Sequence, residues 1–93
     1  MQSKRRKKRL YGNIKVLQMI EGRQIRAARG LLGWSRSDLV QASGVSMSAV
    51  LRLEGGQADS RSSTLGKITD ALNAAGVVFV NQGADGVGVL IRS

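Results

Sequence analysis

The sequence predicts a mainly α-helical domain of four helices, with a basic arm before it and a β-hairpin after it. Three observations lead to this fold class. Apolar residues recur at helical spacing between residues 19 and 76, glycines divide that stretch into short helices, and a β-branched run replaces the helical pattern after Gly76. We therefore expect a flexible arm over residues 1–18, a helical domain over residues 19–76 and a hairpin over residues 77–93.

The arm is defined by its charge. Seven of the fifteen basic residues and none of the six acidic ones lie within residues 1–18, and six of the seven are consecutive: Lys4, Arg5, Arg6, Lys7, Lys8 and Arg9. Such a run repels itself and suits a polyanion partner. Three interpretations stay open, namely an arm that follows DNA, a solvated tail with non-specific affinity, and a segment foreign to the domain. For residues 10–18 the periodicity does not decide between strand and helix.

The first helix is expected over residues 21–32 and is ended by Gly33. Its spacing places four apolar residues on the buried side: Ile25, Ala28, Leu31 and Leu32. The arginines lie on the other sides of the helix. Arg26 and Arg29 are expected on the solvated surface, where charged side chains usually lie.

A second helix is predicted after Ser35. Serine at a helix start accepts a hydrogen bond from an otherwise unpaired backbone N–H, and Asp38, three residues later, completes a pair that resembles a capping box. Leu39 and Ala42 fall on one face of this helix. Gly44 then begins a tight turn.

Ser46 occupies the cap position of the third helix, which runs to Glu54 and carries Val50 and Leu53 on one face. Two short helices joined by a tight turn make a helix-turn-helix motif. The exposed face of the second helix in such a motif can enter the major groove of DNA.

This stretch resembles the Xre-type, lambda-repressor-like DNA-binding domains. The resemblance covers about residues 22–80 and rests on residues at matching spacing: Ser35, Leu39, Ala42, Gly44, Val45, Ser46, Val50, Leu53, Glu54 and Gly55. Val40 departs from the pattern, because the family usually has a small residue where the two helices cross. The resemblance implies a four-helix fold, double-stranded DNA as partner, and a role for Trp34 as a core anchor.

The resemblance also implies which side chains meet DNA. Base edges would face Met47, Ser48 and Arg52 of the third helix, and arginine can bridge guanine O6 and N7. Leu51 is expected to one side and partly buried. Phosphates would face residues at two helix starts and in the loop after the third helix: Ser35, Arg36, Ser46 and Arg61. A carboxylate so close to phosphates needs a partner, so we expect Glu54 to pair with Arg36 or Arg61.

The fourth helix is expected over residues 63–75, because Leu65, Ile68, Leu72 and Ala75 form one apolar stripe. Gly76 ends it. Residues 77–80 and 87–92 are rich in β-branched side chains and predict two strands around a polar turn. Their apolar content exceeds what one helix can cover. We therefore expect a homodimer formed through the hairpin, the alternative being a lid on the protein's own helices.

The composition argues against catalysis. The chain has no cysteine and no histidine, and its six carboxylates are scattered, so acid–base and metal chemistry are poorly supplied. We expect no enzymatic activity, no cofactor and no metal, and, without a membrane-spanning stretch, a cytoplasmic protein. The favoured function is a dimeric transcriptional regulator, more readily a repressor. The alternatives are a protein-binding antitoxin or antiactivator, and an architectural protein that binds DNA through its arm.

Overall fold

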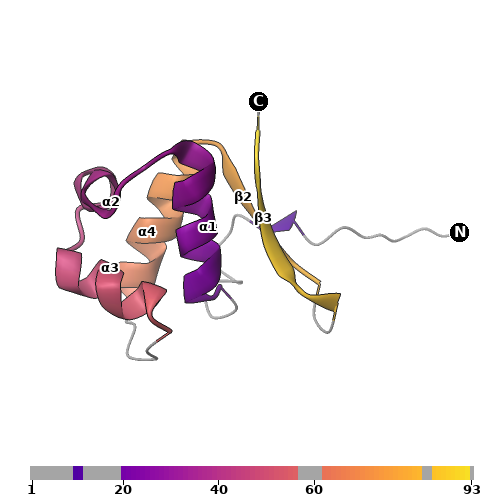
Figure 1. The fold of residues 1–93 in the computed structure, drawn as a ribbon, viewed down its shortest axis with the longest axis horizontal. Helices are drawn as coiled ribbons and strands as arrows, with labels where there is room; N and C mark the ends of the chain where they lie inside the picture. The colour runs from indigo at the N-terminus through magenta and orange to yellow at the C-terminus, as the bar shows by residue number, and fades with distance from the viewer. Residues whose placement is uncertain (1–9, 12–19, 57–61, 83–84, 93) are drawn as a thin grey trace, which may run out of the picture.

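A computed structural model describes residues 10–11, 20–56, 62–82 and 85–92. Within these residues the order of elements is β1 (Leu10–Tyr11), α1 (Gly22–Leu32), α2 (Arg36–Ser43), α3 (Met47–Glu54), α4 (Ser62–Ala74), β2 (Val77–Asn81) and β3 (Val87–Ile91). The helices form one body, and the sheet lies beside α1 and α4, on the side away from α3 (Figure 1). No helix of the described residues is both long and apolar enough to cross a membrane. The predicted fold class is confirmed, and the predicted ends of the helices and of β2 and β3 lie within about one residue of the observed ends.

Capping residues fix the starts of the short helices. Ser35 Oγ accepts a hydrogen bond from the Asp38 N–H at 3.0 Å, and the Asp38 carboxylate accepts one from the Ser35 N–H at 2.9 Å. Ser46 Oγ accepts a hydrogen bond from the Ala49 N–H at 3.1 Å. Both predicted caps are therefore confirmed. They satisfy backbone donors that the helices themselves leave unpaired.

Two glycines end helices in the left-handed region. Gly33 follows α1 with φ 71°, and Gly44 follows α2 with φ 78°. A side chain at such a φ is strained, so glycine allows the chain to reverse at both places. The reversal at Gly44 turns α3 across α2, which gives the predicted helix-turn-helix.

The core lies between the four helices and the inner face of the sheet. It is built from apolar side chains of every helix, of the turn between α2 and α3, and of β2: Ile25, Ala28, Leu39, Val45, Ala49, Val50, Leu53, Leu65, Ile68, Leu72, Val77 and Phe79. Trp34 is half-buried and packs against this cluster, as expected of a core anchor. Val40 is also half-buried against it, so the larger residue at this position is accommodated where the helices cross.

One expectation about a helix face was wrong. Leu31 was placed on the buried side of α1 but is 46% exposed, at the C-terminal end of the side that carries Gln24. Gln24 itself is buried, with 2% of its surface exposed. Ala42, which the spacing places on one face of α2 with Leu39, is exposed, whereas Leu39 is buried.

The sheet has three strands in the order β1-β2-β3, all antiparallel. Leu10 pairs with Val80 and Tyr11 with Phe79, so part of the segment left open between strand and helix is a strand. Residues 12–18 lie outside the described part. The sheet rests on the protein's own helices, because the Gln24 side-chain amide on α1 donates to Val80 O at 3.1 Å and to Gly88 O at 3.0 Å. The hairpin therefore packs on the protein's own helices, as the lid alternative expected. Whether it also pairs with a second chain is not tested by these contacts.

The start of α1 approaches the end of α3 very closely at Gly22. A Cβ atom at this position would lie 2.1 Å from the Leu53 carbonyl oxygen and 2.9 Å from that of Glu54. Both neighbours are backbone atoms and cannot rotate away. The absence of a side chain at residue 22 therefore sets the distance between α1 and α3.

We predict that Gly22→Ala destabilises the protein by about 1–3 kcal/mol, the usual range for forced overpacking. Gly30→Ala is the matched control on the same helix, because a Cβ there meets nothing within 4 Å. Since alanine is the better helix former, this control should stabilise by up to about 1 kcal/mol. Denaturant unfolding of the two variants measures both effects. Equal stability of the two variants would contradict the close approach of the α1 backbone to the end of α3 at Gly22.

Candidate nucleic-acid interface

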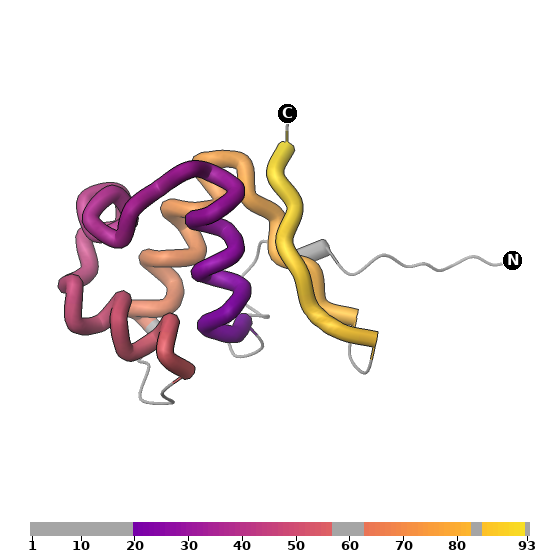
Figure 2. Tube along the Cα trace, viewed as in Figure 1, coloured from indigo at the N-terminus to yellow at the C-terminus, as the bar shows by residue number. Residues whose placement is uncertain are grey.

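The third helix has one buried and one exposed side. Ala49, Val50 and Leu53 face the core, with 9%, 0% and 8% of their surface exposed. On the opposite side Met47, Ser48 and Arg52 are exposed, as the sequence predicted. α3 lies at the end of the molecule opposite the sheet (Figure 2), so this side is not covered by any described element.

Leu51, which was expected to one side and partly buried, keeps 48% of its surface exposed. At about 100° per residue, position 51 falls between positions 47 and 48 around the helix axis. It is therefore near the middle of the exposed arc that begins at Met47 and ends at Arg52. Together with Met47, it gives this polar arc an apolar part.

The predicted phosphate-contacting residues surround α3 in part. Ser35 and Ser46 are exposed at the starts of α2 and α3, and both hydroxyls already accept the capping hydrogen bonds. Arg36, in the first turn of α2, is exposed as well, with its guanidinium held by Glu54. Arg61 and the basic residues 4–9 lie outside the described part of the chain.

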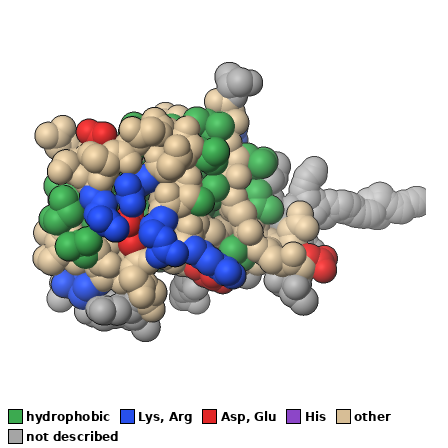
Figure 3. Space-filling view, viewed as in Figure 1, with side chains coloured by type: hydrophobic (Ala, Val, Ile, Leu, Met, Phe, Trp, Pro, Cys, Tyr) green, Lys and Arg blue, Asp and Glu red, His purple; other side chains and the backbone are tan. Residues whose placement is uncertain are grey.

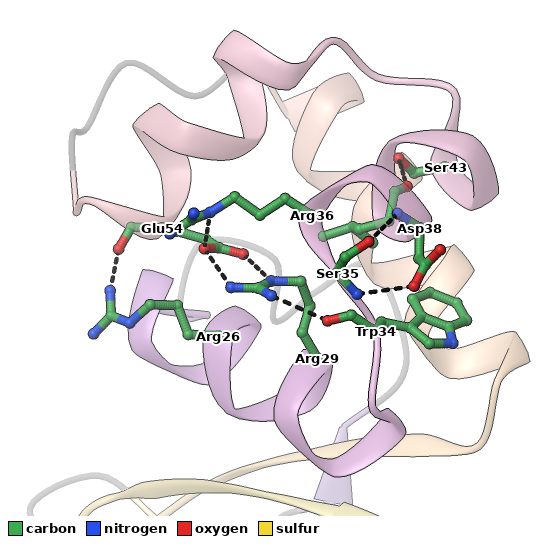
Figure 4. A network of polar contacts seen from close by, with 9 residues as sticks. Arg26, Arg29, Trp34, Ser35, Arg36, Asp38, Ser43 and Glu54 are labelled. Carbon is green, nitrogen blue, oxygen red and sulfur yellow. Dashed lines mark hydrogen bonds and ion pairs between the residues drawn. The ribbon is translucent and has the colours of Figure 1, made fainter.

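Glu54, the last residue of α3, is the centre of a buried ionic cluster (Figure 4). Its side chain is 2% exposed and accepts hydrogen bonds from Arg29 Nε at 2.5 Å, Arg29 Nη2 at 3.0 Å and Arg36 Nε at 3.0 Å. Arg29 also donates to the Trp34 carbonyl at 3.1 Å, and Arg26 donates to the Glu54 backbone carbonyl. The cluster therefore joins α1, α2 and the end of α3.

The expected Arg36–Glu54 pair is confirmed, whereas the expected solvation of Arg29 was wrong. The Arg29 side chain is only 16% exposed, because it lies over the Glu54 carboxylate. The sequence held a signal for this pair. Glu54 lies one turn after Val50, on the apolar side of α3, and a carboxylate on a buried face requires a charged partner.

The ionisation of Glu54 depends on its arginines. Burial by itself raises the pKa of the Glu54 carboxyl, but the hydrogen bonds and charges of Arg29 and Arg36 outweigh it, so this pKa lies below its ordinary value. The hydrogen bond to Glu54 raises the pKa of Arg29 above its ordinary value, against the opposing effect of burial. Both groups are therefore charged across the physiological range.

Arginines form a band over the face shared by α1, α2 and α3, with a carboxylate among them (Figure 3). Within this band Arg29 and Arg36 share a single carboxylate, so the cluster keeps an excess of positive charge. Arg23, near the start of α1, forms an exposed pair with Glu21 at 2.6 Å. The arrangement offers guanidinium groups to an anion beside the exposed side of α3.

We predict that Glu54→Gln destabilises the protein by on the order of 3 kcal/mol at neutral pH, because it leaves two guanidinium groups without their buried counter-charge. Asp70→Asn, which neutralises an exposed carboxylate on α4, serves as the control and should change stability by less than about 0.5 kcal/mol. Urea unfolding provides both values. A loss no larger than that of the control would mean that the cluster contributes little.

The same pair predicts a pH dependence. The folded protein holds the Glu54 pKa below that of the unfolded chain, so acid protonates the unfolded state first. The stabilisation is complete above the ordinary glutamate pKa of about 4.3 and is lost as the pH falls through the lower folded-state pKa. Unfolding between pH 6 and pH 2 should therefore show a steeper loss in the wild type than in Glu54→Gln, and parallel curves would contradict the lowered pKa.

Comparison with known proteins gives the family. The model of a family described as a helix-turn-helix domain matches residues 22–79, which is more than half of the chain and includes α1 to α4 and the start of β2. Comparisons with curated proteins and with solved structures found no match. With its capped α2 and α3, its turn at Gly44 and its exposed α3 face, the chain belongs to the helix-turn-helix family of the Xre, lambda-repressor-like type.

Proposed function

We propose that this protein is a sequence-specific transcriptional regulator that binds double-stranded DNA as a homodimer and represses by occupying its site. Membership of the helix-turn-helix family supports DNA binding in general. The observation that carries the proposal is the exposed side of α3, where Met47, Ser48 and Arg52 lie outside the core. A helix of this length fits the major groove with its outer side toward the base pairs.

Each residue of this side has a distinct role in the proposal. Arg52 donates two hydrogen bonds to a guanine, and Ser48 donates or accepts at a base edge. Met47 contacts a thymine methyl group. Leu51, which lies between them, adds a second apolar contact of the same kind, so the protein would favour a half-site that contains thymine as well as guanine.

The surrounding residues would hold the DNA backbone. Arg36 is suited to a phosphate, because Glu54 fixes its guanidinium while almost half of the side chain stays exposed, at 45%. The starts of α2 and α3 at Ser35 and Ser46 add backbone N–H groups and the positive ends of two helix dipoles. Arg61 and the arm of residues 4–9 would add further positive charge. These contacts position the protein and do not read sequence.

Repression follows from occupancy alone, since a bound protein blocks other proteins from the same stretch of DNA. A homodimer would place two α3 helices on a two-fold symmetric site, with half-sites about one helical turn apart. A cytoplasmic location is consistent with a DNA partner in a bacterium.

One observation favours a second candidate. Met47 and Leu51 are 38% and 48% exposed on the same side of α3, and exposed apolar residues also suit a protein surface. On this alternative the protein would be an antitoxin or antiactivator that binds another protein. Selection of binding sites from random duplex DNA separates the candidates, because a regulator recovers a symmetric sequence and a protein-binding module recovers none.

We predict that Arg52→Ala weakens binding to the selected site by about 1–3 kcal/mol and changes binding to random DNA much less. Lys67→Ala, which removes an exposed basic side chain from α4, is the control for the change in charge. Gel-shift titrations on specific and random duplexes measure both variants. Equal losses on the two duplexes would make Arg52 a phosphate-binding residue.

The basic arm is tested by replacing Lys4, Arg5, Arg6, Lys7, Lys8 and Arg9 with glutamine. This change keeps Leu10 and Tyr11, which form β1, whereas a deletion of residues 1–18 would also remove a strand. We expect the slope of log K against log salt to fall by about 0.9 for each phosphate that the arm no longer neutralises, with the sequence preference retained. An unchanged slope would show that the arm does not bind DNA.

A further inference from the structure

Among the described residues, the outer edge of β3 has no neighbouring strand to pair with its backbone groups. The Arg92 N–H donates to Gly76 O at 2.8 Å, and the Gln82 N–H donates to Gly86 O at 2.8 Å. Hydrogen bonding alternates along an antiparallel pair, so the even-numbered residues of β3 bond to β2. The odd-numbered residues Val87, Val89 and Ile91 therefore direct their N–H and C=O groups away from β2. Among the described residues no strand lies on that side, since β3 ends the sheet.

Exposed apolar side chains lie along the same edge. Among the described residues the exposed large hydrophobic side chains are Leu31, Met47, Leu51, Leu90 and Ile91. Two of these belong to α3, and Leu90 and Ile91 belong to β3. Leu31 lies on the side of α1 that carries Gln24, whose amide donates to Gly88 of β3. Hydrophobic side chains are visible at the surface beside β3 in Figure 3.

We propose that this edge pairs with the β3 edge of a second copy of the chain, antiparallel and centred on Val89. The pairing sets Val89 against Val89 and Val87 against Ile91, so every outward N–H and C=O of the strand meets a partner. The two three-stranded sheets become one continuous sheet. Leu90 and Ile91 of each copy then gain cross-strand neighbours on the two faces of the joined sheet, which reduces the exposed apolar surface outside α3.

Charge favours a second copy over another occupant. Asp85 precedes β3 and Arg92 follows it, so the strand has an acidic start and a basic end. In the antiparallel arrangement, Arg92 of each copy lies near Asp85 of the other. The same two contacts occur on both sides of the two-fold axis, as a symmetric dimer requires.

Gln24 connects this interface to the DNA-binding side. Its amide bonds Val80 O and Gly88 O, while its Oε1 accepts the Glu21 N–H at 2.9 Å. The sheet is thereby fixed to the start of α1, which packs against the end of α3 at Gly22. A dimer joined through β3 would hold its two α3 helices in one fixed relative orientation. The fixed orientation of the two α3 helices matters only if the proposed function is correct. The pairing of the β3 edges does not rest on the proposed function.

The first test measures the mass of the full chain without DNA by sedimentation between about 5 and 200 μM, a span that covers weak dimers. We expect a dimer for the wild type and a monomer for Ile91→Lys, since lysine on an edge strand opposes pairing. Leu51→Lys is the matched control, because it places the same charge at an apolar residue of similar exposure on α3. A wild-type monomer at 200 μM, or a dimer that is abolished by Leu51→Lys and kept in Ile91→Lys, would overturn the proposal.

The second test uses charge reversal and amide exchange to examine the register. Arg92→Glu and Asp85→Arg should each weaken the dimer about tenfold, since each change juxtaposes like charges at both ends of the interface, and the double variant should recover most of the loss. In the wild type, exchange at the Val87, Val89 and Ile91 amides should slow as protein concentration rises, because pairing protects them. Additive losses in the double variant, with no concentration-dependent protection, would overturn the arrangement.

These tests are separate from that of DNA recognition. Binding-site selection with the Ile91→Lys monomer should still return a preferred half-site if α3 reads DNA. A dimer that recovers no sequence would leave the β3 pairing intact and refute the proposed function. A wild-type monomer that selects a half-site would refute the pairing and the homodimer, and would leave sequence-specific DNA binding by α3 intact.

Discussion

The position of α3 depends on a carboxylate that is buried at its last residue. Glu54 is held by Arg29 from α1 and by Arg36 from the start of α2, so one side chain relates three helices to each other. Removing a charge from water is costly, and here three hydrogen bonds from two guanidinium groups offset that cost. The ion pair defines which arrangement of the helices is allowed, because another arrangement would leave a buried carboxylate without its partners. Gly22 supports the same geometry by letting the α1 backbone approach the end of α3.

The sheet is the second constraint on the arrangement of the helices, and it packs against the side of α1 that faces away from α3. Phe79 and Val77 of β2 complete the core beneath the helices. Gln24 fixes the position of the sheet on α1, since its side-chain amide donates hydrogen bonds to the carbonyls of two paired residues, Val80 and Gly88. A purely apolar contact would permit sliding between helix and sheet, whereas these two hydrogen bonds are satisfied in one position only. The short strand β1 pairs with one edge of β2, and no strand of the described residues pairs with the outer edge of β3.

The same arginines serve the fold and the proposed function. Arg36 is paired with Glu54, yet 45% of its side chain remains in contact with solvent. A guanidinium group has five donors and can bond a carboxylate on one side and a phosphate on the other. The ionic cluster therefore places positive charge next to the exposed side of α3 without leaving a flexible side chain to be ordered on binding.

The local structure could be predicted along the chain. The caps at Ser35 and Ser46, the turn at Gly44 and the spacing of Val50 and Leu53 depend on residues within one or two helical turns, so they can be predicted along the chain. The same spacing predicted the exposed residues of α3. Contacts between residues far apart in the sequence appear only in the folded chain. The burial of Arg29 depends on a residue 25 positions away, and that of Gln24 on strands 56 and 64 positions away. Leu31 is exposed for the same reason, because a helix face is buried only where another element covers it, and no local pattern shows which elements meet.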